Sequence, residues 1–507
     1  MDALPARGAS VSAERKSTSF LGHTATYAVA NLARRLVGFV MLPIYTRFLT
    51  PADYGVIGLM VFTLALFEPI LGARLGAAVP KFYFDVPEGR ARRTVIWGAL
   101  GLTGAVSVLG MVALILLRRF GSEVIFGDSQ YALALGIFAV NLVSRPVEDT
   151  GMLYLQMHSR SRLFLGISIA KLLLQVVLNV FLVVVWREGI LGVVLSGVIA
   201  SVVLSVGLTL YVAACEAPAF DWRTTQKMVQ FCWPLWFSGL AGLYTGSAGG
   251  IYLRVLDNLS AVGRLELALR FAVVVGMVIW TPFSQHWMPM SYRHFKESDG
   301  ARKFQVAFVG MAVALFLGGL GISIFAQPVI RLMATKPFYA AAEAVPILTF
   351  GFVLNYLRGF FNFSFLATGQ TKVSSACYYV TAAVMTVAYL LLVPRYGLMG
   401  AAVAQCFAFA ASFVYTRQIS RRYYDPGFSL ASVGIFSVVS ITAYLCANVF
   451  LPTESLVIDL LSKSAIWLAA AVALATMGVR TIRTIDAGAL ENLPWPLDRL
   501  SRSAGER

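Results

Sequence analysis

Residues 174–197 read LQVVLNVFLVVVWREGILGVVLSG, with two apolar runs on either side of a short polar turn. Extended outward, the two runs cover residues 163–186 and 190–214. About 20 apolar residues are enough for an α-helix to cross the hydrocarbon core of a bilayer, and strands are much shorter. This stretch therefore predicts two membrane-spanning helices joined by a tight turn.

The composition of the whole chain agrees with this prediction. Of 507 residues, 58% are apolar and 13% are charged, whereas soluble domains carry about 25% charged residues. A soluble enzyme, a nucleic-acid-binding domain and a disordered chain are excluded. The sequence predicts an all-α polytopic membrane protein with about fourteen transmembrane helices. The predicted spans are 20–46, 56–79, 94–117, 131–156, 163–186, 190–214, 228–252, 265–289, 304–327, 338–366, 374–394, 397–418, 429–450 and 462–480.

An internal repeat relates the two halves of the chain. Residues 383–405 read AVMTVAYLLLVPRYGLMGAAVAQ and echo the first stretch at an offset of about 208. At that offset Gly189 and Gly192 correspond to Gly397 and Gly400. Internal repeats are typical of secondary transporters, whose substrate site lies at the repeat interface.

A second pair of loops supports the repeat. The loop around Arg160 and Arg162 corresponds to the loop around Gln370 and Lys372. Six spans in each half predict two six-helix lobes in a parallel pseudo-two-fold repeat, followed by two extra helices. The expected organisation is a cytoplasmic N-terminus (1–19), an N-lobe (20–214), a cytoplasmic inter-lobe loop (215–227), a C-lobe (228–418), spans thirteen and fourteen (429–480) and a cytoplasmic tail (481–507).

Charges in the loops predict the orientation. With the N-terminus inside, the cytoplasmic segments hold 24 Lys and Arg residues, the opposite side holds 10, and seven lie inside spans. Basic loops favour the cytoplasmic side, so both termini are expected to be cytoplasmic. The same bias accounts for most of the net charge of +16 without a nucleic-acid partner.

Seven basic and four acidic residues lie inside the predicted spans. A charge at the bilayer centre costs about 2.5–3.5 kcal/mol, so these side chains should face a cavity or a partner. Glu266 and Arg270 are spaced i,i+4 and can neutralise each other on one helix face. Arg145 forms a similar local cluster with Glu148 and Asp149.

Four other intramembrane cations, Arg34, Arg35, Lys171 and Arg358, have no carboxylate at helical spacing. We expect them to line a cationic cavity. Such a cavity suits an anionic substrate, phosphate above all, because the guanidinium fork matches phosphate oxygens.

Glu68 lies within span two, directly before a proline. It is open whether this residue binds a coupling proton or sodium ion or forms a structural hydrogen bond with an arginine. The chain contains neither a G-x-x-x-x-G-K-[ST] nor an H-E-x-x-H sequence, so we expect no cofactor and no metal.

One stretch has a more specific likeness. Residues 34–59, RRLVGFVMLPIYTRFLTPADYGVIGL, resemble the first-span signature of the polysaccharide-biosynthesis (Wzx-type) flippases, within the multidrug/oligosaccharidyl-lipid/polysaccharide exporter superfamily. LALRF, residues 267–271, resembles the eighth span of that family. The family's Leu-Pro-x-x-Thr-Arg-x-Leu-Thr-Pro-x-x-Tyr-Gly run falls on Leu42, Pro43, Thr46, Arg47, Leu49, Thr50, Pro51, Tyr54 and Gly55.

The resemblance implies two lobes around a cavity that opens alternately to each side of the bacterial inner membrane. It implies a transporter, not an enzyme, that flips an undecaprenyl-pyrophosphate-linked oligosaccharide such as an exopolysaccharide or O-antigen repeat unit. Its partners would be this substrate, membrane lipids and the polysaccharide polymerase and export machinery, with the chain a monomer. The residues expected to hold the pyrophosphate are Arg34, Arg35, Lys171, Arg270 and Arg358.

Two other functions stay open from the residues alone. A cation-coupled multidrug antiporter of the same superfamily should have an acid-rich cavity. A membrane glycosyltransferase or polymerase should have a sizeable outer loop with clustered acids, and the first outer loop offers only Asp53.

Overall fold

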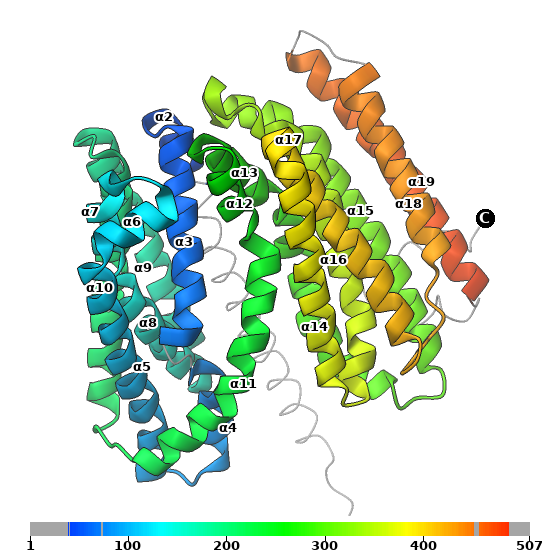
Figure 1. The fold of residues 1–507 in the computed structure, drawn as a ribbon. Coiled ribbons are helices and arrows are strands. Elements are labelled where there is room, and N and C mark those ends of the chain that lie inside the picture. Colours follow the sequence, from blue (N-terminus) through cyan, green and yellow to red (C-terminus); the bar gives the residue numbers. More distant parts are fainter. Residues whose placement is uncertain (1–38, 40, 72–74, 451–455, 486–507) are drawn as a thin grey trace, which may run out of the picture. The chain divides into compact units, whose positions relative to one another are not determined.

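The described part of the chain is built from α-helices with short 3₁₀ and π turns (Figure 1). The computed structural model describes residues 39, 41–71, 75–450 and 456–485. Within these ranges there is no β-strand, and the predicted all-α fold class is confirmed. Most of the first predicted span lies outside the described residues.

The chain divides into two compact units, residues 1–243 (unit 1) and 244–507 (unit 2), and the boundary falls within α11. The helices of unit 1 are α2 (Leu42–Phe48), α3 (Pro51–Leu71), η1 (Leu75–Ala77), α4 (Ala78–Asp85), α5 (Arg90–Leu116), α6 (Arg118–Phe126), η2 (Ser129–Tyr131), α7 (Ala132–Phe138), α8 (Asn141–Met157), α9 (Ser161–Asn179), η3 (Val180–Val185), α10 (Gly189–Cys215) and most of α11 (Trp222–Ser247).

Unit 2 continues from the end of α11 and is also wholly helical where it is described. Its elements are α12 (Gly249–Leu256), α13 (Leu259–Ala272), η4 (Gly276–Trp280), α14 (Thr281–His294), α15 (Gly300–Met333), η5 (Lys336–Phe338), α16 (Ala341–Ala367), α17 (Thr371–Ser420), α18 (Leu430–Leu445), η6 (Cys446–Phe450) and α19 (Leu456–Ile485).

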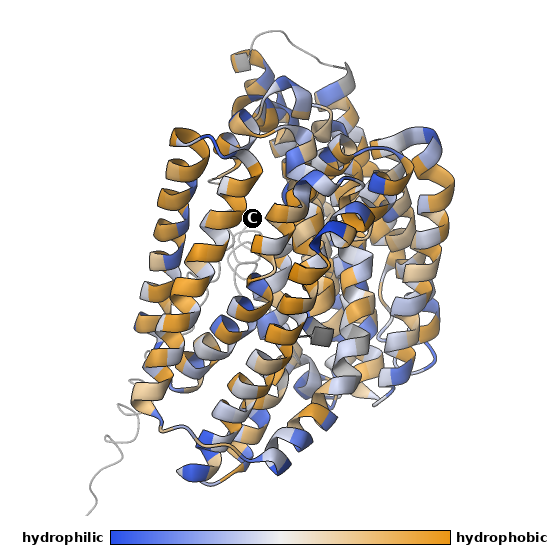
Figure 2. Ribbon diagram, turned by 60° about the vertical axis from the view of Figure 1, so that its left-hand side comes forward, coloured by the Kyte–Doolittle hydropathy of each residue, from blue (hydrophilic) through white to orange (hydrophobic). Residues whose placement is uncertain are grey.

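Among the described residues, nine helical segments are long and apolar enough to cross a membrane. Figure 2 colours these helices by residue hydropathy and shows many hydrophobic residues along them. One of the nine, α17, contains two helices that meet at Gly397, where the backbone leaves the helical conformation, and these are the predicted spans eleven and twelve. The total of fourteen spans stays a prediction.

The Leu-Thr-Pro-x-x-Tyr-Gly run, residues 49–55, has a local structural role at the start of α3. Thr50 donates its hydroxyl to the carboxylate of Asp53 at 2.8 Å, and Asp53 returns its backbone N–H to that hydroxyl at 3.2 Å. Pro51 begins the helix, where its missing N–H costs nothing. This reciprocal cap satisfies N–H groups that a helix start leaves open.

Unit 1 is organised around α8, which packs against α3, α5, α9 and α10. One apolar core lies where α4, α5, α8, α9, α10 and the beginning of α11 converge. It contains fully buried side chains such as Val79, Val95, Leu155, Phe164 and Met228. The polar residues on the buried face of α8 are therefore held inside the helix bundle.

Unit 2 is organised around α16, which packs against α13, α15 and α17. Its core is rich in phenylalanine, with Phe304, Phe308, Phe361 and Phe436 all at most 2% exposed. The predicted extra spans, α18 and α19, both pack against α15 and against each other, and Figure 1 shows them side by side. They are thus part of the compact second unit.

The repeat found in the sequence has a backbone counterpart at its tight turns. Gly189 has φ +54° at the start of α10, and Gly397 has φ +51° inside α17. Residues with a side chain rarely adopt this conformation, so both turns need glycine. The two matched glycines therefore occupy equivalent turns.

The second pair of matched glycines allows close helix packing after each turn. A Cβ atom on Gly192 would lie 3.0 Å from the backbone of Leu182, and one on Gly400 would lie 2.2 Å from the carbonyl oxygen of Leu392. In both units the returning helix touches the backbone of the helix before it, which only glycine permits.

The loops between α8 and α9 and between α16 and α17 also match. Ser159 has φ +53° and Gly369 has φ +73°. The next residues, Arg160 and Gln370, each donate their backbone N–H to the carbonyl five positions earlier, at 3.0 and 2.7 Å. This hydrogen-bond pattern closes the C-terminus of a helix around a left-handed residue. The predicted correspondence of the two loops is thus present in the backbone.

Candidate functional site

A polar cavity of about 290 Å³ lies inside unit 1, between α3, α8, α9 and α10. Five charged residues singled out in the sequence, from three of these helices, meet in this cavity. Its charged and polar lining consists of Glu68, Arg145, Glu148, Asp149, Ser168, Lys171, Gln175 and Ser201.

A direct ion pair in this cavity joins Lys171 of α9 to Glu148 of α8. The Lys171 ammonium donates to Glu148 Oε2 at 2.5 Å, and Glu148 is only 1% exposed. A buried carboxylate is stable only when it is paired and hydrogen-bonded. The two residues are far apart in sequence, so helical spacing alone did not predict their contact.

Arg145 lies in the same cavity as the two carboxylates of its predicted local cluster, Glu148 and Asp149. It lies within electrostatic range of Glu68, Glu148 and Asp149, but in the described part of the chain it makes no direct ion pair. Lys171, and not Arg145, makes the direct contact with Glu148. The five described charged residues of the lining sum to a formal −1. Arg34 and Arg35 lie outside the described residues, so the expected cationic cavity stays a prediction.

Arg358 of α16 is a buried cation of unit 2, at 6% exposure. Its Nη1 donates to the hydroxyl of Ser412 at 3.0 Å, and Ser412 shares a 2.6 Å hydrogen bond with Thr381. The guanidinium lies 4.4 Å from the ring centroid of Tyr378. Among the described residues no carboxylate comes within ion-pair distance of Arg358, so hydroxyls and an aromatic face hold the charge.

The two buried charged sites occupy equivalent positions of the repeat. Glu148 and Arg358 each lie nine residues before the end of their helices, α8 and α16. Lys171 and Thr381 each lie ten residues after the start of α9 and α17. The matched loops between these helices make the correspondence a structural one. At the same position of the repeat, unit 1 has a carboxylate and unit 2 has a guanidinium cation.

The other predicted cavity cations are less fully defined. Glu266 and Arg270 lie on α13 and attract each other electrostatically. Arg34 and Arg35 lie outside the described residues. Whether the five predicted pyrophosphate ligands surround one cavity therefore stays a prediction.

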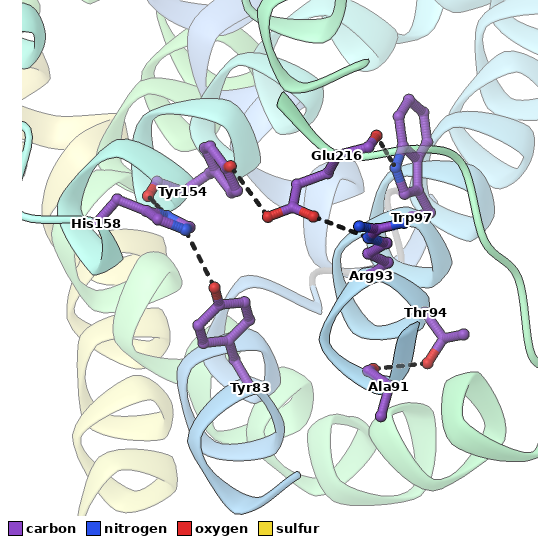
Figure 3. Close-up of polar contacts among 8 residues, drawn as sticks. All are labelled: Tyr83, Ala91, Arg93, Thr94, Trp97, Tyr154, His158 and Glu216. Atoms are coloured by element: carbon purple, nitrogen blue, oxygen red, sulfur yellow. Dashed lines mark hydrogen bonds and ion pairs between the residues drawn. The ribbon is translucent and has the colours of Figure 1, made fainter. Parts of the chain in front are cut away.

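Sequence reasoning missed a polar network at one end of unit 1 (Figure 3). Glu216 follows the last residue of α10, and its carboxylate accepts from Arg93 Nε at 3.1 Å and from the Tyr154 hydroxyl at 3.5 Å. Its backbone carbonyl accepts from Trp97 Nε1 at 3.1 Å. The network ties α5 and α8 to the chain that leaves α10. Its members come from three distant segments, so no sequence pattern marks it.

His158 continues this network toward α4 (Figure 3). Its Nδ1 lies 2.9 Å from the carbonyl oxygen of Tyr154, and its Nε2 lies 3.1 Å from the hydroxyl of Tyr83. Because a carbonyl only accepts, Nδ1 carries the proton, and in the neutral ring Nε2 accepts from the Tyr83 hydroxyl. Burial raises the pKa of Tyr83, which keeps this hydroxyl protonated.

Comparison with known proteins identifies a family that matches this chain. The family described as "Polysaccharide biosynthesis protein" matches residues 20–295, more than half of the chain. An uncharacterized membrane protein of Methanocaldococcus jannaschii is 23% identical over 219 residues, which is 40% of this chain and 42% of that protein. The matched stretch thus spans less than half of that relative.

Solved structures show the fold. The lipid II flippase MurJ in an inward closed conformation has a TM-score of 0.72 at 15% identity, over 90% of this chain and 98% of that one. An inward-facing multidrug resistance MATE family transporter of the MOP superfamily has a TM-score of 0.62 at 14% identity, over 81% and 99%. With the apolar helices, these likenesses show a multi-pass membrane protein with a MurJ/MATE-like fold.

Proposed function

The chain belongs to the polysaccharide biosynthesis protein family, and from that premise we propose that it is a flippase for an undecaprenyl-pyrophosphate-linked oligosaccharide. The substrate would cross the bacterial cytoplasmic membrane by alternating access. The family and the flippase-like fold support a transporter of lipid-linked substrates. Cations within apolar helices support the pyrophosphate as the recognised group.

The observation that carries the proposal is Arg358, a buried arginine in a membrane helix that no described carboxylate neutralises. A cation at membrane depth is costly, and such residues usually mark a substrate path. Arg270 of the same unit is the second expected ligand. Lys171 is the weaker candidate, because Glu148 already offsets much of its charge.

The membrane potential can drive the proposed export without ATP. A membrane that is negative inside favours outward movement of anions by about 2.3 kcal/mol per charge per 100 mV. A pyrophosphate with about two negative charges gains roughly twice that amount. The cations of the cavity would then neutralise the headgroup while the prenyl tail stays in lipid.

Replacement of Arg358 tests the proposal. Arg358→Ala should abolish glycan export while the protein stays in the membrane at normal abundance, and Arg358→Lys should restore only part, because an ammonium lacks the fork geometry. The matched control is Arg395→Ala, which removes one positive charge from an exposed position of the same unit. Normal export by Arg358→Ala would refute a pyrophosphate role for this residue.

Binding separates a transport defect from a folding defect. Undecaprenyl pyrophosphate should raise the thermal unfolding temperature of the purified wild type and of Arg395→Ala. The same ligand should have little effect on Arg358→Ala and Arg270→Ala. Equal stabilisation of all four proteins would contradict the cationic-site assignment.

A cation-coupled antiporter is the second candidate, and the unit 1 cavity favours it. Three carboxylates, Glu68 among them, and two cations line that cavity among the described residues, and carboxylates at membrane depth suit a coupling cation. An antiporter predicts that Glu68→Gln abolishes efflux of a cationic dye from cells, whereas a flippase predicts unchanged dye accumulation. Dye efflux that depends on Glu68 would favour the antiporter over the flippase.

A further inference from the structure

Unit 2 contains another cavity, of about 520 Å³, whose lining includes none of the residues proposed to hold the pyrophosphate. It lies between α15, α16, α17 and α18, and its wall is mostly apolar, with Phe316, Leu320, Ile347, Phe350 and Leu445 among its residues. A site of this size and character can hold one hydrocarbon chain. Leu445, in the α18 wall, is exposed, so a hydrocarbon chain could enter the cavity from the surrounding lipid.

A polar cavity of about 320 Å³ adjoins the apolar one. The two cavities share Glu343 and Tyr444 in their linings. The polar cavity also has Arg331, Tyr339 and Asn448 in its wall. The apolar cavity therefore suits an acyl chain, and the adjoining polar cavity, with one cation and one carboxylate, suits a zwitterionic headgroup.

Two buried hydroxyls indicate that the ligand of the apolar cavity is not a plain hydrocarbon. Thr349 and Ser440 line the apolar cavity and are 1% and 8% exposed. Their hydroxyl oxygens have no hydrogen-bond partner in the described structure. Ser323, in the same wall, satisfies its hydroxyl on the carbonyl of Gly319 at 2.8 Å. Buried hydroxyls are rarely left unpaired, so a ligand with acceptor oxygens fits this site.

We propose that unit 2 binds one bilayer glycerophospholipid whose headgroup carries a phosphate and a primary ammonium. Arg331 would face the phosphate, and Glu343 would face the ammonium. One acyl chain would fill the apolar cavity, where Thr349 and Ser440 donate to its ester oxygens. A polyisoprenoid chain offers no acceptor for these hydroxyls, which separates this ligand from the tail of the transported substrate.

The experiment is native mass spectrometry of the full chain after exchange into nanodiscs with equal phosphatidylethanolamine, phosphatidylglycerol and phosphatidylcholine. One phosphatidylethanolamine should stay bound to the wild type when detergent releases the bulk lipid. Arg331→Ala and Glu343→Gln should each retain about tenfold less, the change that one charge-assisted contact of ~1.4 kcal/mol produces. Lys336→Ala is the matched control, because Lys336 is exposed at the same end of unit 2 and does not line the cavity.

The pattern across lipids decides the result. The Glu343→Gln variant should lose its preference for phosphatidylethanolamine over phosphatidylglycerol, because only the ammonium contact is removed. The double variant Thr349→Val, Ser440→Ala keeps the cavity shape and should also retain less lipid. Equal retention by all variants, or preferred retention of phosphatidylglycerol or a polyprenyl lipid by the wild type, would overturn the proposal. Loss of glycan export is not part of this readout, so failure here leaves the flippase proposal intact.

Discussion

Glu148 in unit 1 and Arg358 in unit 2 occupy the same position of the repeat, yet they carry opposite charges. Glu148 is held by an ammonium from α9, whereas Arg358 is held by hydroxyls and a tyrosine ring of α17. The loops that join the two helix pairs match in their hydrogen bonds and their left-handed residues. The repeat therefore preserves the backbone and leaves the chemistry of its buried sites free to diverge.

The energetic consequences of the two sites differ. A buried ion pair strands a charge when one partner is removed, and this is expensive. A buried cation held by neutral groups leaves no charge behind when it is removed. Charge removal should thus destabilise unit 1 more than unit 2, although unit 2 has the better candidate for substrate binding.

The largest effect should follow from Lys171→Met, which removes the ammonium 2.5 Å from the buried Glu148 carboxylate. We expect a loss of about 3–5 kcal/mol in the free energy of unfolding, seen as a lower thermal unfolding temperature and less protein in the membrane. The double variant Glu148→Gln, Lys171→Met should recover most of the loss. A double variant as unstable as the single one would show that the ion pair is not what stabilises this site.

Arg358→Met should have a smaller effect on stability, about 1–2 kcal/mol. Ser412 keeps its 2.6 Å hydrogen bond to Thr381, so no group loses its last partner. Thermal unfolding of this variant beside Lys171→Met measures the contrast directly. Equal destabilisation by the two substitutions would contradict the proposed difference between the units.

A salt bridge at the end of unit 2 supplies a pH-dependent comparison. Arg417, near the end of α17, contacts Asp425 at 2.7 Å, and Asp425 lies in the connection after that helix. Burial by itself would raise the pKa of Asp425, but the hydrogen bonds from Arg417 and from the Gly427 backbone N–H, together with the charges of Arg417 and Arg421, lower it. A lowered pKa means that the pair stabilises the protein at neutral pH and that this stability is lost as the pH falls through that pKa. Asp425→Asn should reduce the unfolding temperature at pH 7 and approach the wild type at pH 3.

The smallest effect should come from Ser159→Gly. Ser159 adopts φ +53°, and its counterpart in unit 2 is already glycine, Gly369. Relief of the side-chain strain should stabilise unit 1 by up to about 1 kcal/mol, with a slightly higher unfolding temperature. The opposite exchange, Gly369→Ser, should destabilise unit 2 by a similar amount. A fall in stability for Ser159→Gly would break the equivalence of the two loops.

The sequence by itself determined the features that depend on neighbours along the chain. Long apolar runs predicted the membrane helices because hydrophobic length and backbone hydrogen bonding decide membrane insertion locally. The matched glycines predicted equivalent turns because a left-handed residue or a close helix contact needs glycine at one position. The helix cap at Thr50 and Asp53 follows from the spacing of two residues.

Only the tertiary structure decided which distant side chains meet. The sequence grouped Arg145 with Glu148, and both line one cavity, but only the packing of α8 against α9 shows that Lys171 makes the direct contact with that carboxylate. The Glu216 network and the two adjoining cavities of unit 2 also join segments that are far apart in sequence. Partner choice depends on the rotation and contact of whole helices, and a long arginine or lysine side chain reaches several neighbours, so local spacing cannot select among them.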